Sequence, residues 1–192
     1  PNQPTSLTQG AFDIGIKGEK IAAIDNDLSS LSDSVWDVRG LCLLPGMIDS
    51  QVHFRDPGAP HKEDFASGTQ GAILGGITSV FDMPNTKPNT STPERYLDKL
   101  KQVGEKAYCD FALYAGATGS NNQELAEMEN LPGCCGIKIF MGSSTGDLLV
   151  AEDQALESIL KTGKRPIAVH CEDERLLNER KSLAIDAAHP RA

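Results

Sequence analysis

From Pro45 onward, apolar runs of strand length alternate with segments of helical character. We predict strands over residues 46–54, 77–83, 108–115, 135–141 and 166–171. Helices are predicted near residues 62–75, 93–106, 121–130 and 152–163, and another begins near 173. Thr92 and Pro93 are typical of a helix start, and Gly163 is typical of a helix end. Strands that alternate with helices at this spacing predict βαβ units and a parallel sheet.

The first 45 residues have a different pattern. Residues 12–24 are two alternating runs joined at residues 17–20, which predicts a β-hairpin. Val35–Val38 and Leu41–Leu44 add two more predicted short strands. We interpret residues 1–45 as part of a small β-sandwich domain.

Two α/β folds are compatible with five β/α units: an open doubly wound sheet and a (β/α)8 TIM-like barrel. The open sheet usually binds a nucleotide, but no Gly-x-Gly-x-x-Gly or P-loop motif follows any predicted strand. A complete barrel needs about 250 residues, whereas the chain has 192. We therefore expect residues 46–192 to be the first five β/α units of a barrel, in the N-terminal part of a longer protein.

Charge and cysteine content narrow the possible partners and compartment. The net charge of −9 argues against nucleic acid or an anionic membrane as a partner, because both select basic surfaces. No apolar run approaches the roughly 18 residues that span a bilayer. The five cysteines lie in or beside apolar runs, which indicates small buried side chains in a reducing compartment. We expect a cytoplasmic protein without a membrane segment.

Polar side chains that could take part in catalysis or metal binding lie at the end of the first barrel strand. The apolar residues before it predict a buried strand, and alternation places Gln51 and His53 on one face, opposite Val52. Two such side chains can converge on one metal ion. The turn-forming residues 56–58 then lift Arg55 out of the sheet, where its guanidinium can bind a carboxylate.

Other candidates lie at or near the ends of later strands. Lys138 stands alone in an apolar strand, so it is predicted to be buried, either in an ion pair or as a functional amine with a lowered pKa. His170 ends the fifth strand and is a candidate metal ligand. Asn85 follows the second strand and can offer an amide donor beside Arg55. The active sites of barrel enzymes lie at this end of the strands.

These motifs resemble the amidohydrolase superfamily, and its dihydroorotase branch in particular. There the first strand usually reads His-x-His-Phe-Arg-Glu/Asp-Pro-Gly, and residues 51–58 match it except that Gln51 replaces the first histidine. Residues 136–141 resemble the motif that carries a carboxylated lysine, and residues 83–86 read Met-Pro-Asn-Thr. The resemblance implies that His53, a carboxylated Lys138 and His170 bind one or two Zn²⁺ ions, with Gln51 as a further candidate. It also implies that Arg55 and Asn85 bind the substrate carboxylate.

Three functions follow from this resemblance. The first is a zinc-dependent dihydroorotase, which hydrolyses dihydroorotate reversibly to N-carbamoyl-aspartate in pyrimidine synthesis and is a homodimer at full length. The second is a non-catalytic homologue that serves as a scaffold, for which Gln51 is the main argument. The third is a hydantoinase or allantoinase, which Arg55 disfavours. The general-base aspartate of the family is expected beyond Ala192.

Overall fold

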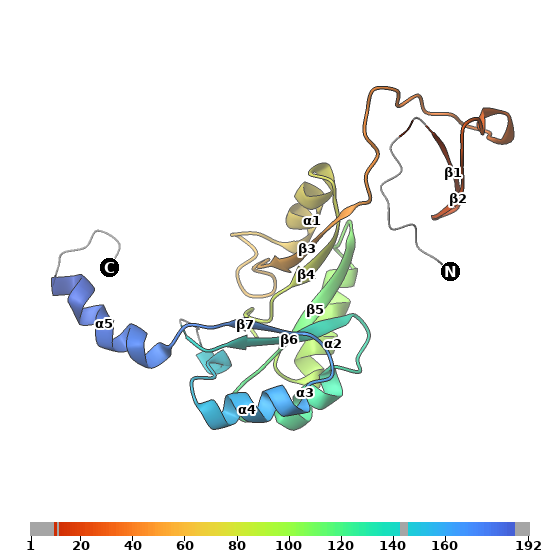
Figure 1. Cartoon of the computed structure of the whole chain (residues 1–192). Helices are drawn as coiled ribbons and strands as arrows, with labels where there is room; N and C mark the ends of the chain where they lie inside the picture. The colour runs from red at the N-terminus through yellow and green to blue at the C-terminus, as the bar shows by residue number, and fades with distance from the viewer. Residues whose placement is uncertain (1–9, 11, 143–145, 187–192) are drawn as a thin grey trace. The chain divides into compact units, whose positions relative to one another are not determined.

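The computed structural model describes residues 10, 12–142 and 146–186. The chain divides into two compact units, Pro1–Pro45 and Gly46–Ala192, which are considered separately below. Figure 1 shows a two-stranded hairpin in the first unit and a five-stranded sheet in the second.

The predicted hairpin is present in the first unit. Strands β1 (Asp13–Lys17) and β2 (Lys20–Asp25) pair in antiparallel fashion, and a short 3₁₀ helix, Ser29–Leu31, follows. Gly18 closes the turn at φ +62°, a conformation that glycine adopts without the clash a Cβ would cause. Membership of a β-sandwich stays a prediction.

The two further strands predicted in this unit are wrong. Val35–Val38 and Leu41–Leu44 are not strands, and Trp36 and Leu41 are 85% and 75% exposed. The alternation of apolar and polar residues indicates only which side chains would face a packed surface if the segment were a strand. An extended segment becomes a strand only when a neighbour satisfies its backbone hydrogen bonds. Within the described residues, no strand pairs with either segment.

The second unit contains all five predicted strands in one parallel sheet. Their order is β3-β4-β5-β6-β7, so each strand lies beside the next one in the sequence. The strands are β3 (Met47–Val52), β4 (Ile77–Asp82), β5 (Asp110–Gly116), β6 (Cys134–Phe140) and β7 (Ile167–His170). The sheet curls as the first part of a TIM-like barrel does (Figure 1), which confirms the predicted fold class.

Each strand is followed by a helix, as predicted. The helices are α1 (Phe65–Leu74), α2 (Pro93–Gly104), α3 (Asn122–Met128), α4 (Asp153–Thr162) and α5 (Glu174–Asp186), with a 3₁₀ turn at Gly146–Leu148. The Thr92 side chain caps α2 by accepting from the Arg95 N–H, and Pro93 is its first residue. None of the helices in the described ranges is long and apolar enough to cross a membrane.

The core lies between the sheet and the helices. Val80, Leu113 and Ile137 from neighbouring strands are at most 1% exposed, and they belong to one apolar cluster with Phe65 of α1 and Tyr96 of α2. Central parallel strands are covered on both faces, which explains the near-continuous apolar sequence of β6.

The prediction that β3 is a buried strand is wrong. Met47 and Ile48 are 56% and 61% exposed, and Leu43 and Leu44 before them are exposed as well. β3 is an edge strand that pairs only with β4 in the described sheet. An apolar sequence indicates that a strand is suited to burial. Whether an edge strand is buried depends on whether another segment packs against it.

The cysteines are less buried than predicted. All five are free thiols, but only Cys134 is buried, whereas Cys42 and Cys171 are exposed. Cys171 follows the last residue of β7, and Cys42 lies in a segment without strand structure, so neither thiol lies within a strand.

Candidate functional site

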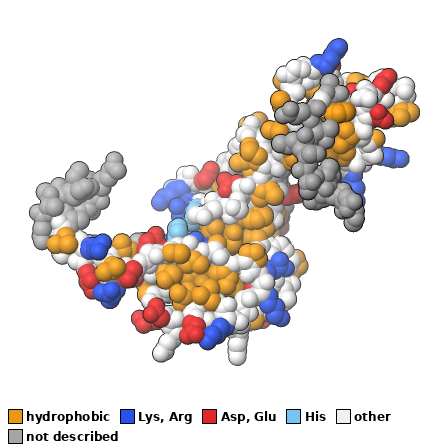
Figure 2. All heavy atoms as spheres, in the orientation of Figure 1, with side chains coloured by type: hydrophobic (Ala, Val, Ile, Leu, Met, Phe, Trp, Pro, Cys, Tyr) orange, Lys and Arg blue, Asp and Glu red, His pale blue; other side chains and the backbone are white. Residues whose placement is uncertain are grey.

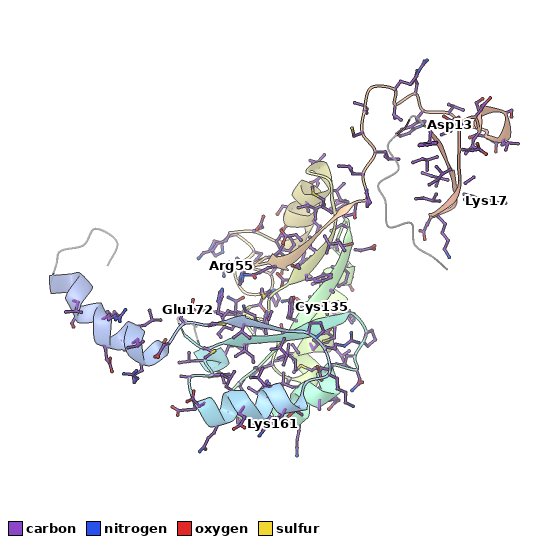
Figure 3. All side chains as sticks on the ribbon, in the orientation of Figure 1. Asp13, Lys17, Arg55, Cys135, Lys161 and Glu172 are labelled. Carbon is purple, nitrogen blue, oxygen red and sulfur yellow. The ribbon has the colours of Figure 1, made fainter. Side chains whose placement is uncertain are left out.

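The five strands are parallel, so their C-terminal ends all lie on one side of the sheet. We call this side the carboxyl edge, which is distinct from the edge strand β3. His53 is the first residue after β3, Asn85 lies three residues after β4, and His170 is the last residue of β7. Figure 3 shows Arg55 and Glu172 at this edge and Cys135 toward the opposite one. In Figure 2, histidine side chains lie beside lysine or arginine side chains on the visible face. The fold therefore brings the predicted site residues to one end of the sheet.

His53 is held by Asn85. The His53 Nδ1 and Asn85 Oδ1 atoms are 2.8 Å apart. Because a carboxamide oxygen only accepts hydrogen bonds, the ring donates through Nδ1, and the lone pair of Nε2 is free to bind a cation. Burial lowers the pKa of His53, the Asn85 hydrogen bond opposes this, and the charge of Arg55 adds to the lowering. The imidazole is therefore neutral near pH 7, as a metal ligand must be.

Lys138 is buried in β6, as predicted. It is 1% exposed, and its Nζ lies 4.8 Å from the centroid of the Phe140 ring. Burial lowers the pKa of Lys138, and the charge of Glu172 partly opposes this. The alternative of an ion pair finds no support in the described residues, where no carboxylate pairs with this ammonium. Burial thus shifts the protonation equilibrium of Lys138 toward the neutral amine, which is the nucleophilic form.

His170 shares a face of the sheet with Lys138. In the parallel β6–β7 ladder, Lys138 is opposite Ala168 and Phe140 is opposite His170. Side chains two residues apart on a strand point the same way, so His170 and Lys138 face the same side. The Phe140 and His170 rings pack edge to face with centroids 5.4 Å apart. The charges of both Lys138 and His170 lower the pKa of His53, which reflects the proximity of all three.

Arg55 and Gln51 are exposed residues on either side of His53. The backbone N–H of Arg55 donates to the Glu63 carbonyl at 3.0 Å, outside the sheet as predicted. The Gln51 N–H donates to Asp49 Oδ1 at 3.0 Å, where the register of β3 against β4 is irregular. The Arg55 guanidinium is thus available to an anionic ligand at the carboxyl edge.

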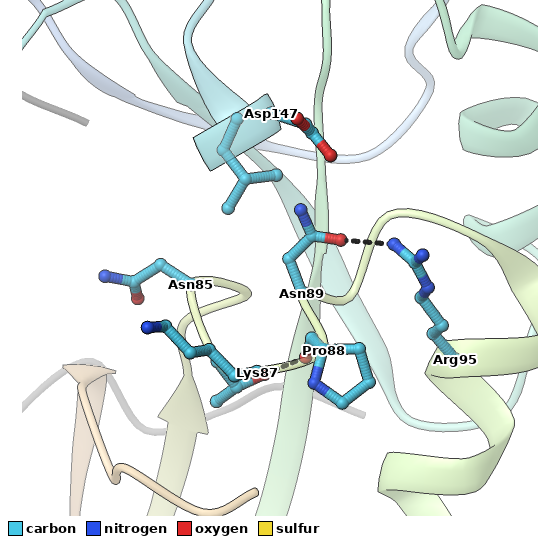
Figure 4. A pocket seen from close by; sticks show the side chains of 8 residues that line it. Asn85, Lys87, Pro88, Asn89, Arg95 and Asp147 are labelled. Carbon is cyan, nitrogen blue, oxygen red and sulfur yellow. Dashed lines mark hydrogen bonds between the residues drawn. The ribbon is translucent and has the colours of Figure 1, made fainter. Parts of the chain in front are cut away.

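A pocket of about 400 Å³ opens beside Asn85. Its wall combines the loop after β4, Arg95 of α2 and the 3₁₀ turn, and the Arg95 Nη1 donates to Asn89 Oδ1 at 2.7 Å (Figure 4). The lining residues are Asn85, Thr86, Lys87, Pro88, Asn89, Arg95, Asp147 and Leu148. Asn85 therefore borders both His53 and a space of small-molecule size.

The residues present fit a metal ion only if Lys138 contributes. Among the described residues, no three His, Cys, Asp or Glu side chains come together as a metal site. The imidazoles of His53 and His170 and a lysine converted to a carbamate would supply nitrogen and oxygen donors suited to zinc. The unpaired, buried state of Lys138 is the observation that agrees with such a conversion.

Two buried charged residues beneath the edge, Asp82 and Lys99, belong to no motif that we recognised. Helical spacing could have revealed Lys99, because Tyr96, Lys99 and Val103 lie on one face of α2 and are all buried. Asp82 ends an apolar strand, which is where a barrel places functional side chains.

Comparison with known proteins agrees with the geometry. The amidohydrolase family model matches residues 42–191. The chain is 39% identical to a dihydroorotase of Methanosarcina acetivorans over 175 residues, which cover 89% of this chain and 37% of that protein. It is 37% identical to an allantoinase of Deinococcus radiodurans over 165 residues, or 83% and 37% of the two chains.

A solved structure of similar fold is the L-hydantoinase (dihydropyrimidinase) of Arthrobacter aurescens. It superposes with a TM-score of 0.80 at 32% identity, over 93% of this chain and 40% of that one. The chain thus spans about two fifths of the length of the relatives it matches. By sequence and by fold, the chain belongs to the amidohydrolase family.

Proposed function

We propose that the chain is part of a zinc-dependent cyclic amidohydrolase, and specifically a dihydroorotase. The reaction would open the cyclic amide of dihydroorotate to give N-carbamoyl-aspartate, as a step of pyrimidine synthesis. The similar proteins named dihydroorotase, allantoinase and hydantoinase support a cyclic amide as substrate. The free cysteines agree with a cytoplasmic location. We propose a homodimer at full length.

In this proposal, His53, His170 and a Lys138 carbamate hold the metal, and Gln51 is a weak additional ligand. When bound, zinc would polarise the amide carbonyl and lower the pKa of water. Asn85 fixes the His53 ring with its Nε2 lone pair available. Burial raises the fraction of neutral Lys138, which is the form that adds CO₂ and releases a proton.

The observation that carries the choice of substrate is Arg55. Its guanidinium is exposed, two residues after His53, and its charge acts on that ring. A planar guanidinium binds a carboxylate through two parallel hydrogen bonds. Dihydroorotate carries a carboxylate, whereas unsubstituted hydantoin does not, so Arg55 favours dihydroorotate over a plain hydantoin.

We expect Arg55→Lys in the intact protein to raise KM for dihydroorotate about 10–100-fold, because the ammonium cannot form the double hydrogen bond. The zinc content should stay unchanged, and so should turnover of any hydantoin that lacks a carboxylate. Steady-state kinetics with both substrates measures this, with the exposed Arg175→Lys as the matched control. Equal losses on both substrates would show that Arg55 is structural.

Zinc analysis tests the role of Gln51. A carboxamide is a poorer zinc ligand than an imidazole, so we expect the dialysed intact protein to keep one zinc per chain and to hold a second weakly. Gln51→His should then retain two. Two tightly held zinc ions in the natural protein would contradict this expectation. Absence of both zinc and turnover would favour the scaffold homologue instead.

A further inference from the structure

A buried ion pair lies on the helix-covered side of the sheet, beneath the carboxyl edge. Asp82, the last residue of β4, is fully buried, and Lys99 of α2 is 2% exposed. The Lys99 Nζ and Asp82 Oδ2 atoms are 2.5 Å apart. Such a pair is expensive to desolvate, and apolar side chains of similar volume would often be as stable in its place. Its presence therefore calls for a reason other than stability.

The remaining hydrogen bonds of the pair lead to the candidate site. Asp82 Oδ1 accepts from the Phe54 N–H at 2.9 Å, and Phe54 lies between His53 and Arg55. The Lys99 Nζ also donates to the Met83 carbonyl at 3.0 Å, two residues before Asn85. One ion pair thus holds the two backbone segments whose side chains meet in the His53–Asn85 hydrogen bond.

We propose that Asp82 and Lys99 are positioning residues that set the orientation and tautomer of His53. Neither touches the imidazole. They fix the backbone beside His53 and the backbone before Asn85, so that Asn85 Oδ1 accepts from Nδ1–H and the lone pair of Nε2 stays free. The connection to catalysis rests on the proposed function, whereas the effect on His53 does not.

The raised pKa of Asp82 agrees with this role. Burial raises the pKa of Asp82 to about 6, against the opposing effects of Lys99 and of the Phe54 N–H. The Asp82 carboxylate is thus buried in an unfavourable environment, where Lys99 and the Phe54 N–H stabilise its charge. A second ion pair joins the turn after α2 to the turn after β3: the Lys106 Nζ and Asp56 Oδ2 atoms are 2.6 Å apart, and the lysine side chain is 41% exposed. This more exposed pair supplies a natural comparison.

The test is the tautomer of His53 in the metal-free intact protein, read from the ring ¹⁵N chemical shifts near pH 7.5 and assigned with His53→Gln. The natural protein should show the Nδ1–H form. We expect Asp82→Asn and Lys99→Met to give a mixture of tautomers, and zinc affinity to fall about tenfold. Lys106→Met, the control in the turn just after α2, should leave the tautomer unchanged.

A double variant, Asp82→Leu with Lys99→Met, replaces the ion pair by two apolar side chains that can pack against each other. We expect this variant to fold even if the single variants do not. If a folded variant lacking the pair keeps the natural tautomer, the proposal is overturned. Failure of all three variants to fold would make the pair structural and would overturn it too. A natural protein that shows the Nδ1–H form but hydrolyses no dihydroorotate would contradict the proposed function alone.

Discussion

Replacing Lys138 with methionine should abolish hydrolysis by the intact protein and, at the same time, stabilise the metal-free fold. Lys138 is 1% exposed and has no ion pair with a described carboxylate. Methionine fills the same volume without a buried amine, so we expect a gain of about 1–3 kcal/mol in the free energy of unfolding. Loss of several kcal/mol of transition-state stabilisation corresponds to a rate loss on the order of 10³-fold.

The pH dependence gives this prediction a second readout. Burial lowers the pKa of Lys138 in the folded protein, so between that value and about 10.4 the unfolded chain binds more protons. The contribution of Lys138 to stability therefore becomes less unfavourable as pH rises through this window. The advantage of Lys138→Met should shrink correspondingly in denaturant titrations at increasing pH.

Lys161→Met is the matched control, because Lys161 is 73% exposed and pairs with Glu157 on the same helix. Its unfolding free energy should change by less than about 0.5 kcal/mol, with zinc content and activity retained. A metal-free Lys138→Met protein that is less stable than the natural one would argue that Lys138 has a favourable partner. Retained activity would exclude the carbamate.

Gly136→Ala should destabilise the sheet next to the site by about 3 kcal/mol. A Cβ at Gly136 would clash with the Pro166 carbonyl oxygen and would lie 3.2 Å from the Tyr114 ring. That carbonyl accepts the Ile137 N–H at 3.0 Å, so it cannot move without loosening the pairing of β6 with β7. The same pairing sets His170 beside Lys138, and zinc retention should fall with stability.

Gly71→Ala provides the comparison for this substitution. Gly71 lies within α1, and a Cβ there meets nothing within 4 Å. Alanine should therefore stabilise the protein by about 0.5–1 kcal/mol through helix propensity alone. Denaturant unfolding of both variants measures the contrast. A Gly136→Ala protein as stable as the natural one would mean that β6 and β7 can separate without penalty.

The alternation of strands and helices in the second unit was readable from the sequence, because local rules determine it. Apolar runs of strand length predicted the five strands, and Thr92 with Pro93 placed the start of α2 where the structure has it. Such signals act within a few residues and require no knowledge of the rest of the chain.

Whether a segment is paired or covered could not be read in this way. Val35–Val38 has the alternation of a strand but is not one, and Met47 in β3 is exposed although its sequence is apolar. Pairing and covering depend on segments that are remote in sequence, and local patterns carry no information about them.

The same division holds for the candidate site. The sequence by itself determined that His53, Lys138 and His170 stand at or near the ends of parallel strands, because residue type and strand position are both local properties. Only the tertiary structure decided that Asn85 holds the His53 ring and that Asp82 and Lys99 hold the backbone beneath it. These hydrogen bonds join residues 32, 28 and 16 positions apart, so their partners are fixed by the curl of the sheet and the packing of α2 against it.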